Sequence, residues 1–221
     1  MNRRRVIFLG PPGSGKGTQA RKIAEKSSLL PISSGETLRR EIREQSEVGR
    51  LAANFVESGL LVPDDIITGV MIAGIKKLPS GTGFILDGFP RTVPQADALQ
   101  GGLAAMSMSI DAVVDFELDD AEIVKRIVNR RVCTKCEEPY NLESRPPKVA
   151  GVCDICGGAL TQRVDDREDV IMTRLGAYRA QTAPLVAHFA RQGLLCSVRA
   201  NRPAHEVEAD ILAILESPTS K

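Results

Sequence analysis

The feature that most constrains the fold is a glycine-rich segment near the N-terminus. It reads GPPGSGKGT over residues 10–18, directly after the apolar run VIFL at residues 6–9 and before a segment whose apolar residues have helical spacing. A strand, a glycine loop and a helix in this order form a cradle for phosphate, because backbone N–H groups and the helix dipole converge on the anion. Lys16 adds a mobile positive charge. The segment therefore predicts a nucleotide-binding P-loop.

Apolar runs recur along the chain, with helical segments between them. They lie at residues 6–9, 84–87, 112–118 and 194–198, and residues 31–33 are a candidate for a short fifth strand. Strands that alternate with helices favour a parallel sheet that is covered by helices on both faces. The sequence therefore predicts an α/β fold of three layers with a central parallel five-stranded sheet.

Local signals mark several helix boundaries. Ser33 and Glu36 have the spacing of a capping box, and so do Asp119 and Glu122. Pro184 lies inside the helical pattern of residues 166–192 and is expected to kink or break it, because proline lacks an N–H group.

The phosphate loop departs from the usual pattern at one position. A Ser or Thr that holds Mg²⁺ commonly follows the lysine, whereas here Gly17 follows Lys16 and the hydroxyl comes on Thr18. We expect Mg²⁺ to be held by nucleotide phosphates and waters, with Asp87 acting through water. Asp87 ends the apolar run at residues 84–86, so it should emerge at the same sheet edge as the loop. The alternative for Asp87 is a strand-end residue that caps the next turn.

A cysteine-rich stretch at residues 132–163 interrupts the alternation. Its pattern C-x₂-C-x₁₆-C-x₂-C is formed by Cys133, Cys136, Cys153 and Cys156. Two such pairs complete a tetrahedral zinc site with four thiolates, which is closed and structural. Four free buried thiols are the alternative. A stretch this short has too little core to fold alone, so the metal would hold it. Cys196 lies in an apolar run and is expected in the core.

Three further segments point to one family when they are taken with the phosphate loop. They read DGFPRTVPQAD at residues 87–97, ISSGETLR at residues 32–39 and RIVNRR at residues 126–131, and RVDD at residues 163–166 ends the cysteine-rich stretch. Their order and spacing resemble adenylate kinase, a nucleoside monophosphate kinase family, in its form with a long zinc-binding lid. The resemblance covers nearly the whole chain. The family also carries Gly after the lysine, so Gly17 is a family trait.

The resemblance implies a reaction and a domain plan. The reaction is reversible transfer of the terminal phosphoryl group from ATP to AMP, which gives two ADP and uses Mg²⁺. The P-loop core would comprise residues 1–32, 63–128 and 167–221. Residues 33–62 would form a helical insertion that binds the monophosphate, and residues 129–166 would form the zinc-binding lid, with hinges at its two ends near Arg130 and Asp165.

The resemblance also assigns site residues by position. The ATP contacts would be Gly13, Ser14, Gly15, Lys16, Gly17, Thr18, Arg126, Tyr140 and Arg202. The AMP contacts would be Ser34, Arg39, Leu60, Leu61, Val62, Gly88, Phe89, Pro90, Arg91, Gln95, Arg163 and Arg174, with Gln95 reading the adenine edge. The catalytic groups would be Lys16, Arg91, Arg126, Arg130, Arg163 and Arg174. This set suits phosphoryl transfer, in which guanidinium groups neutralise two polyanions and no covalent nucleophile is needed.

Some positions depart from the family pattern. Leu60 stands where many relatives have Lys, and Asn141 stands where His is common in the lid. The sequence RANR at residues 199–202 replaces a more usual turn with Asp and Gly, which weakens the transfer of an adenine contact to Ala200 or Arg202.

Other function classes are weighed against this reading. The net charge of +1 provides no attraction to nucleic acid or an anionic membrane. No run of residues approaches a membrane span or the apolar region of a signal peptide, so we expect a cytoplasmic protein. The resemblance implies a monomer whose partners are ATP, AMP and ADP. The alternatives are a UMP/CMP-type kinase and a zinc-ribbon nucleic-acid binder that is fused to an NTPase. A GTP switch would need an N-K-x-D sequence, which the chain lacks.

Overall fold

A central parallel sheet organises the molecule, as the alternation of apolar runs predicts. The computed structural model describes residues 4–217, so positions 1–3 and 218–221 of the expected core lie outside the described residues. Within that range the sheet has five strands in the order β2-β3-β1-β4-β8, and all neighbouring pairs are parallel. The strands are β1 (Arg5–Leu9), β2 (Leu29–Ser33), β3 (Gly83–Asp87), β4 (Ala112–Glu117) and β8 (Leu195–Arg199).

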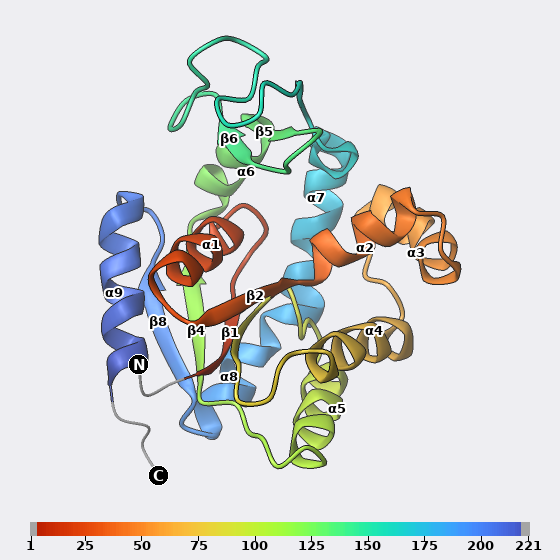
Figure 1. Cartoon of the computed structure of the whole chain (residues 1–221), viewed down its shortest axis with the longest axis vertical. Coiled ribbons are helices and arrows are strands. Elements are labelled where there is room, and N and C mark those ends of the chain that lie inside the picture. The colour runs from red at the N-terminus through yellow and green to blue at the C-terminus, as the bar shows by residue number, and fades with distance from the viewer. Residues whose placement is uncertain (1–3, 218–221) are drawn as a thin grey trace.

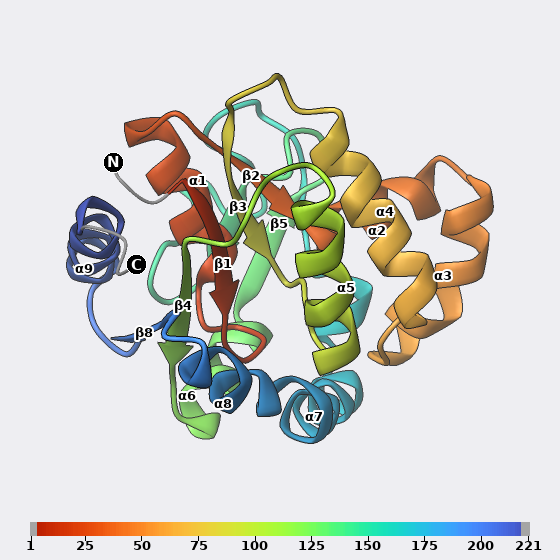
Figure 2. The ribbon, with the colours of Figure 1, turned by 90° about the horizontal axis from the view of Figure 1, so that it is seen from below.

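Helices cover both faces of the sheet, which gives three layers (Figure 2). One face carries α1 (Lys16–Lys26) and α9 (Ala204–Glu216), and the other carries α4 (Asp64–Lys76), α5 (Val93–Ala104) and α8 (Pro184–Arg191).

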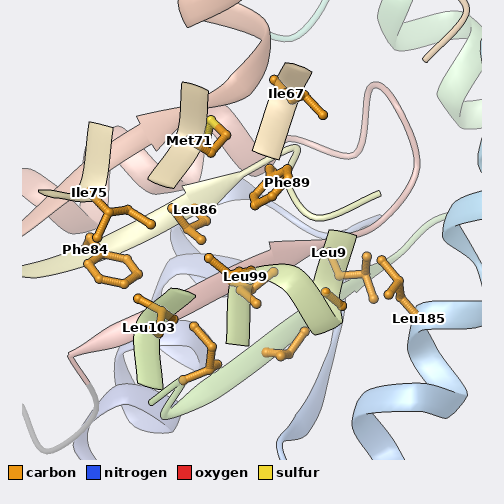
Figure 3. Close-up of a cluster of buried hydrophobic side chains, with 14 of the residues drawn as sticks. Leu9, Ile67, Met71, Ile75, Phe84, Leu86, Phe89, Leu99, Leu103 and Leu185 are labelled. Atoms are coloured by element: carbon orange, nitrogen blue, oxygen red, sulfur yellow. The ribbon is translucent and has the colours of Figure 1, made fainter. Parts of the chain in front are cut away.

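Successive side chains of β1 point to opposite faces of the sheet, so this strand contributes to two hydrophobic clusters. Val6 and Phe8 pack in the cluster under α1 and α9, whereas Ile7 and Leu9 pack in the larger cluster under α4, α5 and α8. Figure 3 shows part of the larger cluster, in which Phe84 and Leu86 of β3 meet side chains from the covering helices. Because both faces are buried, the strands read as continuous apolar runs.

A helical insertion follows β2 and extends to one side of the sheet (Figure 1). It consists of α2 (Ser34–Arg43) and α3 (Glu47–Ser58). The hydroxyl of Ser33 accepts a hydrogen bond from Glu36 N at 3.5 Å, so the predicted helix start is confirmed. The corresponding prediction at Asp119 is half right, since α6 (Asp120–Val128) begins there but the Asp119 side chain makes no capping hydrogen bond.

A small antiparallel sheet follows α6 and forms the end of the molecule drawn at the top of Figure 1. All its residues are described, and its strands β5 (Arg130–Cys133), β6 (Pro139–Asn141) and β7 (Leu160–Thr161) lie in the order β6-β5-β7. The 3₁₀ turn η1 (Val164–Asp166) then leads into α7 (Glu168–Ala177).

The expected break near Pro184 is present. A π-helical turn, η2 (Tyr178–Thr182), separates α7 from α8, and Ala183 N donates to Tyr178 O at 2.9 Å. Proline cannot donate the next helical hydrogen bond, so the chain widens here before α8 begins.

Two findings bear on the remaining expectations. Cys196 is half-buried because β8 is an edge strand, so its predicted place in the core is wrong. None of the helices in the described part of the chain combines the length and the apolar character that a membrane crossing needs.

Candidate functional site

A large cleft lies at the carboxyl edge of the central sheet. It has a volume of about 950 Å³ and is lined by the phosphate loop, the helical insertion, the small antiparallel sheet, α7 and residues 200–204. A second cavity of about 70 Å³ adjoins it and is lined by the insertion and by the segment after β3. Ligand sites of open α/β sheets are expected at this edge.

The phosphate loop has the backbone that its glycines permit. Gly13 and Gly15 have positive φ angles of 81° and 94°. Lys16 Nζ donates to Gly10 O at 2.8 Å, to Pro11 O at 2.7 Å and to Ser14 Oγ at 3.2 Å. Burial lowers the pKa of Lys16 to about 8, although the nearby Asp87 carboxylate opposes the shift. A compact cation therefore lies folded against the carbonyl groups of the loop.

The contact between Gly17 and Asp87 explains the unusual residue after the lysine. A Cβ atom on Gly17 would lie 3.2 Å from Asp87 Oδ2. A Ser side chain at position 17 would therefore crowd the carboxylate that ends β3. The loop and Asp87 lie side by side as predicted, and the acid occupies the space that a hydroxyl would need.

The predicted guanidinium groups converge on the large cleft from distant parts of the chain. Those that line it are Arg39, Arg91, Arg126, Arg130, Arg163 and Arg174. They come from the insertion, the segment after β3, α6, β5, the segment before η1 and α7. Burial lowers the pKa of Arg91 to about 10 and that of Arg163 to about 9. Nε of Arg163 is buried and has no hydrogen-bond partner among the described residues.

Two buried carboxylates hold part of this cluster in place. Arg130 Nε donates to Asp166 Oδ2 at 2.7 Å, and Arg174 Nη1 donates to Asp165 O at 2.8 Å and Asp166 Oδ1 at 3.2 Å. Burial by itself lowers the pKa of Arg130. The hydrogen bond and the charge of Asp166 raise this pKa, and the net shift is upward. Our sequence reasoning placed Asp165 only at a hinge and missed the role of Asp166. The two acids that closely follow Arg163 in the RVDD segment were the sequence signal for this role.

Nine of the twelve predicted acceptor residues line the second cavity, and Phe89, Pro90 and Arg163 do not. Ser34 Oγ and Arg91 Nε both donate to Gly88 O, at 2.7 and 2.8 Å. The second cavity is lined by Ser34, Arg39, Leu60, Leu61, Val62, Gly88, Arg91, Gln95 and Arg174. Pro90 lines the large cleft. Phe89 was expected at the site, but its side chain is 1% exposed and points into the main core, as Figure 3 shows.

Two arginines that were predicted to contact ATP, Arg126 and Arg202, also line the large cleft. Arg126 Nη2 donates to Ala200 O at 2.9 Å, and Arg126 Nε donates to Glu122 Oε1 at 2.7 Å. Arg202 forms an ion pair with Asp210 of α9. Both arginines line the cleft and are already held by protein partners.

Tyr140 borders the cleft, but its polar group is used inside the small sheet. The residue is 3% exposed, and its hydroxyl lies 3.5 Å from Cys153 Sγ and accepts from Asp154 N at 2.8 Å. Packing around the thiols is therefore the main contact of this side chain, and a direct polar contact to ATP from its hydroxyl is not favoured.

The four predicted cysteines form one cluster. Their Sγ atoms all lie within 4.8 Å of one another, and three of the pairs are 3.4, 3.6 and 3.4 Å apart. Zinc with four sulfur ligands at about 2.3 Å requires sulfur separations of about 3.8 Å, so a small outward adjustment would seat the ion. The hydrogen bond from Tyr140 lowers the pKa of Cys153 to about 6, which favours the thiolate that binds metal. The donor set fits structural zinc.

Together these features define a class of protein. A phosphate loop at the carboxyl edge of a parallel sheet, an adjoining second cavity and a cluster of arginines between them are typical of P-loop proteins that handle nucleotide phosphates. A family model described as adenylate kinase matches residues 8–194. The chain belongs to the adenylate kinase family.

Individual relatives agree over nearly the whole length. A protein named adenylate kinase from Citrifermentans bemidjiense is 45% identical over 212 residues, which covers 96% of this chain and 99% of the relative. Others from Clostridioides difficile and Methanosarcina barkeri are each 42% identical, and they cover 96% of this chain and 99% and 98% of their own lengths.

Proposed function

We propose that this protein is an adenylate kinase that reversibly transfers the terminal phosphoryl group of ATP to AMP and so forms two ADP. Membership of the family supports the reaction type. The single observation that carries the proposal is that Lys16 and the six arginines named above all line one cleft, which has an adjoining second cavity. Two nucleotides bring many negative charges together, and this cluster neutralises them while it aligns the reacting groups.

ATP binds in the large cleft. The N–H groups of residues 13–18 hold its phosphates, and Lys16 turns from the carbonyls of Gly10 and Pro11 to the phosphates when they arrive. The base lies against Arg126 and the segment around Ala200 and Arg202, because these residues line the cleft and Arg126 is hydrogen-bonded to Ala200 O.

AMP binds at the second cavity. Arg39 and Arg91 hold its phosphate, since both guanidinium groups line the boundary between the two cavities. Gln95 meets the base, and the backbone of residues 60–62 closes the far side of the cavity. The amide of Gln95 offers both a donor and an acceptor, which suits adenine.

The transferring group passes between the two sites. Arg130, Arg163 and Arg174 surround it and stabilise the charge that develops on its oxygens. Asp165 and Asp166 orient two of these arginines through the hydrogen bonds described above. The AMP phosphate oxygen attacks the terminal phosphorus in line, and the ADP leaving group departs without a covalent enzyme intermediate.

Two metals would have separate roles. Mg²⁺ supplies further charge neutralisation when it is bound to the ATP phosphates, and Asp87 is placed to hold its waters, because oxygen ligands suit this ion and the carboxylate faces the loop. Structural Zn²⁺ would be held by Cys133, Cys136, Cys153 and Cys156.

The division into moving parts remains our proposal. Residues 1–32, 63–128 and 167–221 act as the core, residues 33–62 as the monophosphate-binding insertion and residues 129–166 as the lid. The lid hinges near Arg130 and Asp165, and its closure excludes water so that the phosphoryl group passes to AMP. We further propose a cytoplasmic monomer with no nucleic-acid or membrane partner.

A coupled assay of ADP formation with ATP, Mg²⁺ and each of AMP, UMP and CMP tests the reaction. We expect AMP to be the preferred acceptor. Faster turnover of UMP or CMP would contradict the proposal and move the protein to a sister activity. Isothermal titration with a dinucleotide that joins two adenosines through phosphates should reveal one molecule bound per chain, in competition with both ATP and AMP.

A further inference from the structure

The amide of Gln95 is held by the protein on both sides. The residue is 2% exposed and lines the second cavity. Its Oε1 accepts a hydrogen bond from Arg91 N at 2.7 Å, and its Nε2 donates to Asp64 Oδ1 at 2.6 Å. Both ends of this amide therefore have a fixed partner before any ligand binds.

Asp64 belongs to a ring of hydrogen bonds that joins two helices. It lies in the first turn of α4, and its other oxygen, Oδ2, accepts from Thr92 Oγ1 at 2.8 Å. Thr92 caps α5 and accepts from Gln95 N at 3.2 Å. Because the hydroxyl of Thr92 donates its hydrogen bond to Asp64, the carboxylate of Asp64 is held facing Gln95.

The chemistry of the two partners permits only one orientation of the amide. A carboxylate can only accept, and the N–H group of Arg91 can only donate. Rotation of the amide by 180° would place Oε1 against the carboxylate of Asp64 and the NH₂ group against the N–H of Arg91. Each contact would then be repulsive, and two buried polar groups would lose their partners.

A locked amide distinguishes two classes of purine. After these bonds are made, Nε2 keeps one N–H and Oε1 keeps one lone pair for a ligand. A 6-aminopurine presents an amino donor beside the N1 acceptor, whereas a 6-oxopurine presents an oxygen acceptor beside an N1–H donor. An amide that is free to rotate could match either pattern, but a fixed amide matches only one of them in a base whose phosphate is anchored.

We propose that Asp64 determines specificity by fixing the orientation of Gln95, so that the acceptor site takes a 6-aminopurine monophosphate and rejects a 6-oxopurine monophosphate. This inference rests on the proposed function, in which the second cavity holds the base of the acceptor nucleotide. Asp64 is a positioning residue, since it acts on the ligand through Gln95.

The test compares AMP with inosine monophosphate, which differs at the 6-position of the base. In the unmodified protein, kcat/KM for AMP should exceed that for inosine monophosphate by at least about 100-fold, because a mispaired buried site rejects its ligand strongly. In Asp64→Asn, the new amide can turn to match either orientation of Gln95, so that only the hydrogen bond from Arg91 N still opposes rotation of Gln95. The preference should fall by roughly tenfold or more.

Asp65→Asn is the matched control. Asp65 is exposed in the same first turn of α4, so its replacement removes the same charge from the same helix end. It should leave the preference unchanged. A ring that serves only to join α4 to α5 would instead lower the melting midpoint of Asp64→Asn and change both substrates alike, and that result would overturn the inference.

Two further measurements separate the possible failures. In a Gln95→Leu background, Asp64→Asn should have no effect on the preference, because its effect acts through the amide. Equal use of both monophosphates by the unmodified protein would overturn the inference without any variant. No turnover of AMP at all would refute the proposed function, whereas normal AMP turnover with an unchanged preference in Asp64→Asn would refute only the role of Asp64.

Discussion

The two covers of the cleft, the proposed lid and the helical insertion, are held together in different ways. The lid buries Cys133, Tyr140 and Cys153 in a small cluster of its own, separate from the cores of the central sheet. The insertion has no such cluster among its described residues, and its Leu38 and Ala52 belong to the main core. The proposed zinc site would therefore take the place of a hydrophobic core in the lid, whereas the insertion depends on the stability of the whole protein.

The two proposed nucleotide sites also differ in the kind of cation that they contain. The donor side relies on Lys16, whose pKa is lowered by burial to about 8. The proposed acceptor site instead has Arg39 and Arg91, and burial lowers the pKa of Arg91 to about 10. A mobile point charge suits the phosphate that moves, and rigid forks suit the phosphate that must be positioned.

The largest expected effect is the loss of stability that follows removal of one thiolate from the lid. Cys153→Ser should abolish stoichiometric zinc binding and lower the melting midpoint by more than about 10 °C, because structural zinc contributes on the order of 10 kcal/mol in small modules. Residual activity should remain at low temperature. Metal analysis and calorimetry measure both, with Cys196→Ser as the control outside the cluster. An unchanged midpoint together with no zinc in the unmodified protein would contradict the role of the lid metal.

Removal of the donor-side cation should come next. Lys16→Ala should lower kcat by roughly a thousandfold or more, because the lysine stabilises charge that develops during transfer. Lys26→Ala, on the same helix but away from the lining of the cleft, should stay close to the unmodified rate. Steady-state kinetics under saturating ATP and AMP provide the comparison. A loss of only tenfold would count against the assigned role.

A steric change within the insertion should affect the whole protein. A Cβ atom on Gly49 would overlap the backbone of Glu41 where α3 crosses α2. Gly49→Ala should therefore lower the free energy of unfolding by about 1–3 kcal/mol in a single transition. Gly69→Ala in α4, where a Cβ meets open space, should be neutral or stabilising by up to about 1 kcal/mol. Separate unfolding of the insertion, detected by urea titration with two probes, would contradict the shared core.

The contrast in pKa predicts different pH profiles for the two sites. Lys16 is protonated below its pKa of about 8 and neutral above it. The affinity of the free enzyme for ATP should fall by about tenfold between pH 8 and pH 9.5, since the lost proton removes an attractive charge. The affinity for AMP should change less over that range, because Arg91, with a pKa of about 10, is still mostly charged at pH 9.5 and the phosphate is already fully ionised. Parallel titrations with both nucleotides measure this, and parallel profiles would contradict it.

The sequence predicts most of the site because its groups are attached to strands and helices with clear patterns. Asp87 follows an apolar strand, and the register of the parallel sheet then places it beside the phosphate loop. The side chain of Phe89 was expected at the site, but the short turn after β3 directs it into the core. No periodic pattern in the sequence extends over such a turn. The hydroxyl contacts of Tyr140 and the role of Asp166 were not foreseen for a related reason. Their partners are 13 and 36 residues away, and only the folded chain brings them together.

The smallest expected effect concerns the contact between the two covers. Glu137 has a φ of 60°, which is unfavourable for a residue other than glycine, and it directly follows a zinc-site cysteine. Its carboxylate pairs with Arg43 of the insertion, and its carbonyl accepts from Arg21 Nη1 of α1 at 3.1 Å. Glu137→Gly should relieve about 1 kcal/mol of backbone strain and weaken closure of the lid at the same time.

The expected outcome is therefore a change in kinetics without a loss of stability. The melting midpoint of Glu137→Gly should stay equal or rise, KM for ATP should increase a few-fold, and kcat should rise slightly if opening of the lid limits turnover. Arg43→Gln should reproduce the kinetic change without the gain in stability, since it removes the same ion pair and leaves the strain. Arg40→Gln, on the same helix but without a partner from the lid, is the control. A lower midpoint with unchanged kinetics in Glu137→Gly would mean that Glu137 supports only the fold of the lid, and the two covers would then close independently.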